Sequence, residues 1–124
     1  MKMSVREFEE VVREALRDIP PALAAYMEDV CVDIEAMPRE EDLAEAGIED
    51  PEELLGLYHG TPLTERGVEF DQYLPDRVTI YQRNIERMCG AREEMVHEIR
   101  KTVFHEVGHH FGLDEDQLAE LGFE

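Results

Sequence analysis

Residues 102–118 read TVFHEVGHHFGLDEDQL, and this stretch decides the fold because it carries the pattern H-E-x-x-H on a predicted helix. His105 and His109 are four residues apart, so on an α-helix their rings project from one face, one turn apart. Both rings can then bind one Zn²⁺ at the roughly 2.0–2.1 Å typical of zinc–imidazole bonds. Glu106 is rotated by about 100° from the first histidine, where it can reach a water beside the metal without binding the metal. The pattern predicts a hydrolytic zinc centre with Glu106 as general base.

A glycine after the motif predicts where the third ligand lies. Gly112 can take a positive φ, which would end the helix and turn the chain back beneath the metal. In the longer pattern H-E-x-x-H-x-x-G-x-x-H/D the third ligand falls at Glu115, and a carboxylate is an accepted zinc ligand. Asp116 is the alternative, and both acids could instead complement the N-terminal dipole of a final helix, EDQLAEL. Asp114 is disfavoured as a ligand because Asp114 and Gln117 have the spacing of a capping box for that helix.

The residues before the motif predict that it ends one long helix. From about Arg92 the apolar residues recur at intervals of three and four, as on one face of a helix. Apolar side chains also surround the motif, and we expect them to give it a dry, buried setting: Val103, Phe104, Val107 and Phe111. The predicted stripe consists of Met95, Ile99, Thr102, Glu106 and His109, with Val96 beside it.

The N-terminal part of the chain predicts two helices and a strand. Ser4 and Glu7 have the spacing of a capping box that begins the first helix. Pro21 can open a second, short helix that reaches Tyr26. The alternation of apolar residues in VCVDIEAMP (residues 30–38) is typical of a strand. The apolar face of the first helix consists of Phe8, Val11, Val12, Ala15 and Leu16.

The middle of the chain predicts two further strands. REEDLAEAGIEDPEE (residues 39–53) indicates a short helix followed by a surface loop, and LLGLYHGTPL (residues 54–63) a strand. TERGVEFDQYLPD (residues 64–76) is a turn-rich connection, and the alternation in RVTIYQRNI (residues 77–85) predicts a third strand. Two glycines of the second strand mark places where another segment comes close to the backbone: Gly56 and Gly60.

Composition predicts one folded domain over residues 1–124, because a chain of 124 residues with 43% hydrophobic residues can bury one modest core. The elements predict an α+β fold in which one long helix carries the chemistry. We expect no membrane segment, since no apolar run approaches the roughly 20 residues that span a bilayer. The start of the chain does not resemble a signal peptide, and Cys31 and Cys89 lack metal-ligand spacing. We therefore expect reduced thiols and a cytoplasmic protein.

The net charge of −19 bears on the partners. A strongly negative protein repels phosphate backbones, so we expect no nucleic-acid partner. The charge could favour basic peptide segments, or it could serve solubility alone.

Three segments, in the order in which they occur, resemble the small bacterial zincin-like metallopeptidase family: LLGLYHGTPLTERG, LPDRVTIYQRNI and IRKTVFHEVGHHFGLDEDQLAELGF. The metal helix is common to many zincins, whereas L-Y-x-G-x-P-L-T-E-R is particular to this group. The resemblance runs from about Leu54 onward and more loosely through the N-terminal helix. It implies a minimal zincin-like fold, with a small sheet packed against the long active-site helix, and a metal-dependent peptidase of unknown substrate. His59 stands where the family usually has a different polar residue, so it inherits no role.

Several other side chains are candidates for the cleft. A strand edge can receive a peptide backbone by β-augmentation, so Tyr58 or His59 could lie in the cleft. His110 could line it, although a packed or solvated helix histidine is favoured. Structural roles are also favoured for Tyr81 and Arg66 over stabilising an oxyanion.

The leading hypothesis is a zinc peptidase with one Zn²⁺ per chain, held by His105, His109 and Glu115, which acts on a peptide or protein substrate. We expect a shallow site and a narrow substrate range, and a second copy of the chain or a partner protein could complete the cleft. The alternatives are a metal hydrolase acting on another substrate and a zinc-binding regulatory module without catalysis. Glu106 argues against the module, because a purely structural site needs no base.

Overall fold

The computed structural model describes residues 2–17, 19–60 and 76–120, and over these the chain forms a three-stranded sheet and six helices. The α+β class predicted from the sequence is confirmed, whereas the single domain over residues 1–124 stays a prediction. The helices are α1 (Val5–Ala15), α2 (Pro21–Met27), α3 (Glu40–Ala46), α5 (Gln82–Met88), α6 (Arg92–His110) and α7 (Glu115–Glu120). The strands are β1 (Val30–Glu35), β2 (Gly56–His59) and β3 (Asp76–Tyr81).

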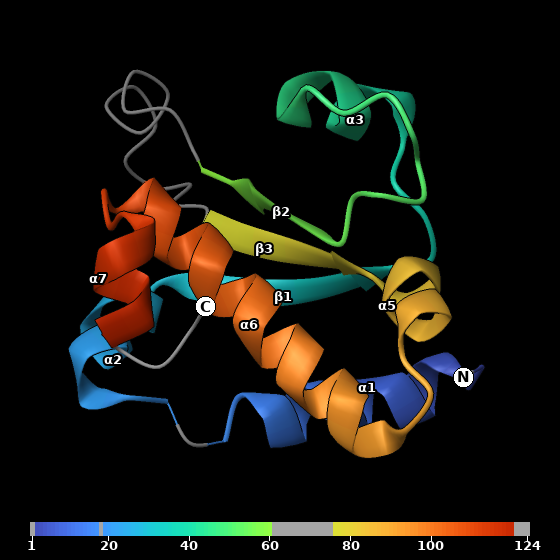
Figure 1. Cartoon of the computed structure of the whole chain (residues 1–124), viewed down its shortest axis with the longest axis horizontal. Helices are drawn as coiled ribbons and strands as arrows, with labels where there is room; N and C mark the ends of the chain where they lie inside the picture. The colour runs from blue at the N-terminus through green and yellow to red at the C-terminus, as the bar shows by residue number, and fades with distance from the viewer. Residues whose placement is uncertain (1, 18, 61–75, 121–124) are drawn as a thin grey trace, which may run out of the picture.

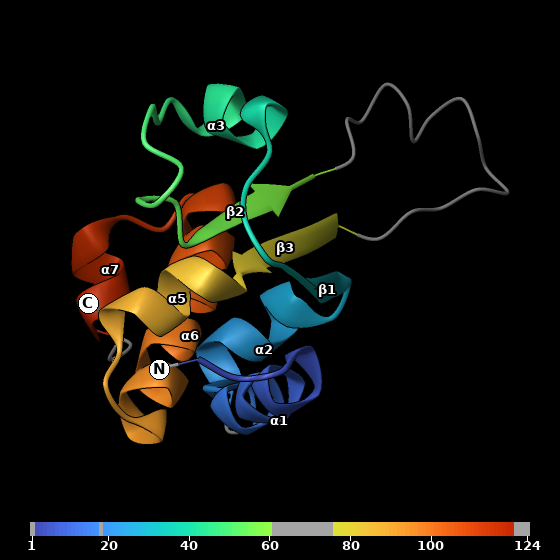
Figure 2. The same cartoon turned by 90° about the vertical axis from the view of Figure 1, so that its right-hand side faces the viewer.

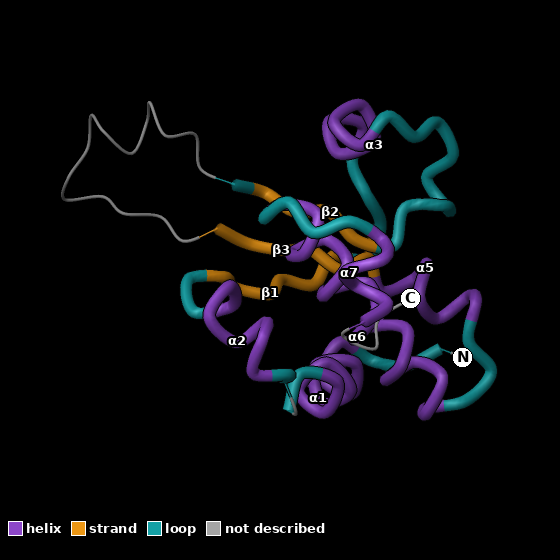
Figure 3. Tube along the Cα trace, turned by 60° about the vertical axis from the view of Figure 1, so that its left-hand side comes forward, coloured by secondary structure: helices purple, strands orange, loops and turns teal. Residues whose placement is uncertain are grey.

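The sheet has the order β1-β3-β2, with β1 parallel and β2 antiparallel to the central strand β3. Helix α6 crosses one face of the sheet, and α1 packs beside it on that face (Figure 1). Helix α3 lies over the opposite face (Figures 2 and 3). Strand β2 is therefore an edge strand that also packs on the long helix.

Two apolar clusters hold these layers together. The larger one joins the sheet to α1 and α6, and Phe8, Ile80 and Phe104 are fully buried in it. The smaller one lies on the other face, where Leu57 and Tyr81 pack against Leu43 and neighbouring residues of the α3 segment. Burial on both faces explains why β3 is almost entirely apolar or buried along its length.

The predicted N-terminal elements are confirmed. The Ser4 hydroxyl accepts a hydrogen bond from the Glu7 N–H at 3.1 Å, and the Glu7 carboxylate accepts one from the Ser4 N–H at 3.4 Å. Pro21 begins α2, and β1 follows at Val30. Neither Cys31 nor Cys89 forms a disulfide, and none of the helices in the described parts of the chain has the length and apolar character that crossing a membrane requires. Gly47 ends α3 with a φ of 71°.

The strand predicted over residues 77–85 is wrong in its second half, because the chain becomes helix α5 at Gln82. Strand β3 loses its neighbours there: the last pairs of its two ladders join Tyr81 to Glu35 and Ile80 to Gly56. The polar residues that follow Tyr81 form hydrogen bonds with partners outside the sheet. The buried Asn84 amide, for example, donates to the carbonyls of Pro51 and Leu54 at 2.7 Å each.

The predictions for the segment that contains Arg66 and for Tyr81 have different outcomes. The turn-rich connection predicted over residues 64–76, with Arg66, lies outside the described residues, apart from Asp76 at the start of β3. Tyr81 lies in the smaller apolar cluster, as its predicted structural role requires. Burial there raises the pKa of its hydroxyl, and the nearby Asp42 carboxylate adds to the shift.

The predicted close approach at Gly56 is confirmed. A Cβ at this position would lie 2.6 Å from Cγ2 of Thr102 on α6 and 3.2 Å from the carbonyl oxygen of Thr79. The missing side chain therefore lets edge strand β2 lie directly on the metal helix.

Gly56→Ala should lower the free energy of unfolding by about 1–3 kcal/mol, because the new methyl group overpacks the contact between β2 and α6. Thr102→Ser removes Cγ2 and should restore part of the loss in the double variant. Gly90→Ala is the control, since a Cβ there meets its nearest atom at 3.8 Å. Urea unfolding measures all four proteins, and equal stabilities of the Gly56 and Gly90 variants would contradict the contact.

A buried carboxylate ties the N-terminus to α5. Glu86 is 4% exposed and accepts hydrogen bonds from the Met3 N–H at 3.0 Å and the Gln82 amide at 2.9 Å. Arg83 pairs with it at 2.7 Å. Burial alone would raise the pKa of Glu86, but these donors outweigh burial and lower it.

Glu86→Ala should cost about 1–3 kcal/mol of unfolding free energy at neutral pH, because buried donors lose their acceptor. The lowered pKa means that the wild type's advantage is present above the unfolded-state pKa of about 4.3 and is lost as the pH falls through the folded-state value. The two proteins should therefore converge in stability on acidification. Urea titrations across that range measure the gap, with exposed Glu10→Ala as control; a gap independent of pH would contradict the assignment.

Candidate metal centre

The metal motif lies in the last two turns of α6, which presents one face to the core and the other to the surface. Val103, Phe104 and Val107 are fully buried, so the helix is anchored through the motif itself. The opposite side is open: the His105 side chain is 18% exposed and the His109 side chain 46%. The dry setting expected around the motif is therefore wrong for its outer side, where Phe111 is also 42% exposed.

Helix α6 ends as the sequence predicts. Gly112 has a φ of 85°, a conformation that strongly favours glycine. Its N–H donates to the carbonyl of His109 at 3.1 Å, and the Leu113 N–H donates to the carbonyl of Gly108 at 2.8 Å. This pair of bonds is the Schellman motif, which reverses the chain direction and leads it back along the helix.

Helix α7 begins at once after this turn. The Asp114 carboxylate accepts from the Gln117 N–H at 2.8 Å, and the Gln117 side chain accepts from the Asp114 N–H at 2.8 Å. The predicted capping box is thus formed, and it engages Asp114 as a cap. Glu115 is the first residue of the helix.

Gly108, inside the motif, seats α7 on α6, a role that the sequence reasoning missed. A Cβ at Gly108 would lie 2.6 Å from Cδ2 of Leu118, which is fully buried. Leu118 fills that space and fixes the register of α7 against the two histidines. The sequence contains a sign of this role. Glycine in a helix interior costs about 1 kcal/mol of helix stability relative to alanine, so its presence there suggests a packing constraint.

The three residues predicted as metal ligands come together in space. Glu115 Oε1 lies 2.8 Å from His109 Nε2, and its other oxygen lies 3.8 Å from His105 Nδ1. One donor atom from each lies within 4.8 Å of the others, and within the described residues no other group of His, Cys, Asp or Glu meets this condition. Asp116 is not part of the group. Metal binding by these residues stays a prediction.

The donor set fits zinc. Two imidazoles and one carboxylate supply three ligands of the kinds that catalytic zinc sites use, and they leave a fourth position free. The exposure of Glu115, 67% at its side chain, gives a metal ion and a substrate direct access.

The predicted base, Glu106, lies on the side of α6 that faces edge strand β2. Its Oε1 accepts a hydrogen bond from the Tyr58 N–H at 3.2 Å. Burial raises the pKa of Glu106, while the Tyr58 N–H and the charges of His109 and His105 oppose part of the rise. Edge strand β2 therefore holds the carboxylate at the position where the two elements meet.

The Tyr58 side chain is fixed on the other side of this contact. Its ring stacks on the His110 ring with centroids 3.9 Å apart, and its hydroxyl donates to Asp76 Oδ2 at 2.7 Å. His110 thus packs against β2, in line with the packed role favoured for it. His59 points elsewhere, with its Nδ1 3.8 Å from Glu45 on α3.

Comparison with known proteins supports a family assignment. The family model described as zincin-like metallopeptidase matches residues 27–123. The match covers β1 through α7 and includes all the residues of the metal motif. A comparison with curated proteins finds no match.

Gly108→Ala should weaken zinc binding by about 10–100-fold, the range seen when the support of a ligand is lost. The new Cβ would push Leu118 and thereby move Glu115, although alanine itself favours the helix. Competition with a chromogenic chelator measures the affinity, and Gly90→Ala is the control. Unchanged zinc affinity would show that α7 can shift without moving the carboxylate.

Proposed function

Because the chain belongs to the zincin-like metallopeptidase family, we propose that it is a zinc-dependent peptidase that hydrolyses peptide bonds in a narrow set of peptide or protein substrates. The observation that carries this proposal is that donor atoms of His105 and His109 on α6 and of Glu115 on α7 lie within 4.8 Å of one another, with Glu106 next to His105 in the chain. A structural zinc site would need no carboxylate beside an open ligand position.

In this proposal His105, His109 and Glu115 hold the zinc ion. When bound, zinc supplies Lewis acidity, which acidifies water and polarises a carbonyl group. Glu106 takes a proton from the attacking water while the oxygen of that water bonds to the carbonyl carbon. The same carboxyl group then gives that proton to the leaving nitrogen as the C–N bond breaks, so one residue serves as base and then as acid.

Edge strand β2 would orient the substrate. The Tyr58 N–H points away from β3, because it donates to Glu106 rather than to the neighbouring strand. An extended peptide could pair with this edge by β-augmentation and pass its backbone over the base. The stack of Tyr58 on His110 and its hydrogen bond to Asp76 would hold that edge still during the reaction.

The exposed ligands support a narrow substrate range. His109 and Glu115 are 46% and 67% exposed at their side chains, so the described residues build one wall of a site and little of a second. A second copy of the chain or a partner protein would supply the missing wall.

Glu106→Gln should abolish peptide hydrolysis by zinc-loaded protein, a loss of about 10²-fold or more, because the amide cannot take up the proton. The variant should keep its zinc, since the amide replaces no ligand. A mass-spectrometric screen of a peptide library, with elemental analysis of bound zinc, measures both. Loss of zinc together with activity would place Glu106 among the ligands, and absence of activity in the wild type would overturn the peptidase proposal.

Glu115→Ala should release zinc at concentrations that the wild type withstands, because one of three ligands is lost. Asp116→Ala and Glu120→Ala change neighbouring acids of the same helix and should leave binding unchanged. Equilibrium dialysis against a zinc buffer compares the four proteins. A larger effect of the Asp116 variant would move the third ligand to that residue.

A further inference from the structure

A groove leads away from the catalytic residues along α6. It has a volume of about 350 Å³ and is bordered by His105 and Glu106 at one end. One side is formed by Gly56 at the start of β2 and the segment before it, with Glu53, and the other by α6, with Glu98.

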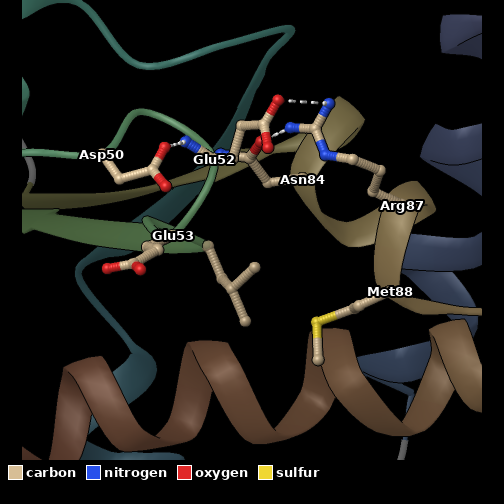
Figure 4. A pocket seen from close by; sticks show the side chains of 7 residues that line it. Asp50, Glu52, Glu53, Asn84, Arg87 and Met88 are labelled. Atoms are coloured by element: carbon tan, nitrogen blue, oxygen red, sulfur yellow. Dashed lines mark hydrogen bonds and ion pairs between the residues drawn. The ribbon is translucent and has the colours of Figure 1, made fainter.

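A second hollow of about 450 Å³ lies next to the groove, and Glu53 and Leu55 border both. Figure 4 shows this hollow, in which the Arg87 guanidinium turns toward Glu52 and Asn84 while the Glu53 carboxylate points the other way. Arg87 lies 3.7 Å from the Glu52 carboxylate and also donates to Asn84. Its charge is thereby engaged and does not neutralise Glu53.

The uncompensated charge of the groove is negative. Over residues 2–17, 19–60 and 76–120, no ion pair or side-chain hydrogen bond engages the carboxylate of Glu53 or Glu98. Among the described residues that border the groove, Lys101 is the one Lys or Arg beside them. The net charge of −19 adds a long-range field of the same sign.

We propose that this groove receives a lysine or arginine side chain of the peptide substrate close to the scissile bond, and that Glu53 and Glu98 are specificity-determining residues. The inference rests on the proposed peptidase function and names its substrate class, a basic peptide. Two carboxylates on opposite walls, Glu53 exposed and Glu98 half-buried, suit a long cationic side chain, whose methylene groups can lie along the groove while the charge reaches the acids. An acidic side chain or a free C-terminal carboxylate would instead pair with Lys101, and Glu53 and Glu98 on the two walls would repel it.

The first experiment measures binding without turnover. Zinc-loaded Glu106→Gln protein is titrated into fluorescent, end-blocked decapeptides of alanine and glycine that carry one arginine, one citrulline or one glutamate at the centre. Citrulline keeps the shape of arginine and removes the charge. The arginine peptide should bind at least about fivefold more tightly than the citrulline peptide, with the preference falling as salt rises.

Charge-neutralising variants then locate the preference. Glu53→Gln and Glu98→Gln should each reduce the arginine preference by about two- to fivefold, the range for partly exposed charge pairs. Lys101→Gln should increase it. The matched control combines Glu10→Gln and Glu41→Gln, which removes two charges outside the groove and should leave the preference intact. Weaker binding after Lys101→Gln, with tighter binding after the two glutamate changes, would overturn the inference in favour of an acidic side chain or a C-terminus.

Cleavage by the wild type separates this inference from the proposed function. Hydrolysis enriched at lysine or arginine supports both. Hydrolysis without a basic preference, together with equal binding of the arginine and citrulline peptides, overturns the inference and keeps the peptidase. Selective binding of the arginine peptide without any hydrolysis supports the basic groove and overturns the peptidase.

Discussion

The contact between Gly108 and Leu118 holds together the arrangement of the three predicted metal ligands. Two ligands come from a single helix and need only its backbone geometry, but the third comes from a different helix and must be carried to them. The left-handed conformation of Gly112 reverses the direction of the chain. Because Gly108 has no side chain, Leu118 can pack against α6 next to the histidines. The carboxylate at the start of α7 then falls within hydrogen-bond distance of His109. Two glycines thus build the ligand set without themselves touching a metal.

A second glycine contact joins the base to the sheet. Because Gly56 presents no side chain to Thr102, strand β2 lies close enough to α6 for the Tyr58 N–H to reach Glu106. The same strand is an edge strand of the sheet that the described residues form, so in the proposed peptidase one short segment both positions Glu106 and offers a backbone to an extended peptide. One strand with two roles suits a small protein, because few residues are available to position the catalytic group and to bind the substrate separately.

The open side of the site and the charge of the protein act together. In the proposed peptidase the exposed side chains of His109 and Glu115 enclose a substrate only in part, so its affinity would have to come from contacts elsewhere on the surface. A groove lined by Glu53 and Glu98, within a field of −19 charges, supplies electrostatic attraction over a distance and contact at short range. Such attraction is screened by salt, so substrate choice would depend on ionic strength as well as on sequence.

The elements with local signals could be predicted from the sequence. The capping boxes at Ser4 and Asp114, the period of the long helix and the turn at Gly112 depend on residues a few positions apart, and all of these are present. The spacing of His105 and His109 is equally local, because one turn of helix sets it. The end of β3 was predicted incorrectly for the opposite reason: the alternation through Ile85 continues, but the neighbouring strands that would sustain it have ended.

Other features follow from contacts between distant elements: the strand that brings the sheet edge to Glu106, and the course of the acidic groove. The spacing of the longer motif favoured Glu115 and left the adjacent Asp116 as an alternative, and the fold places Glu115 beside the histidines. The packing of Leu118 on Gly108 rotates Glu115 toward the histidine pair. Likewise, Glu53 and Glu98 are far apart in the chain and share a groove because β2 lies on α6. Contacts of this kind depend on side-chain volumes across elements, which a sequence pattern does not contain.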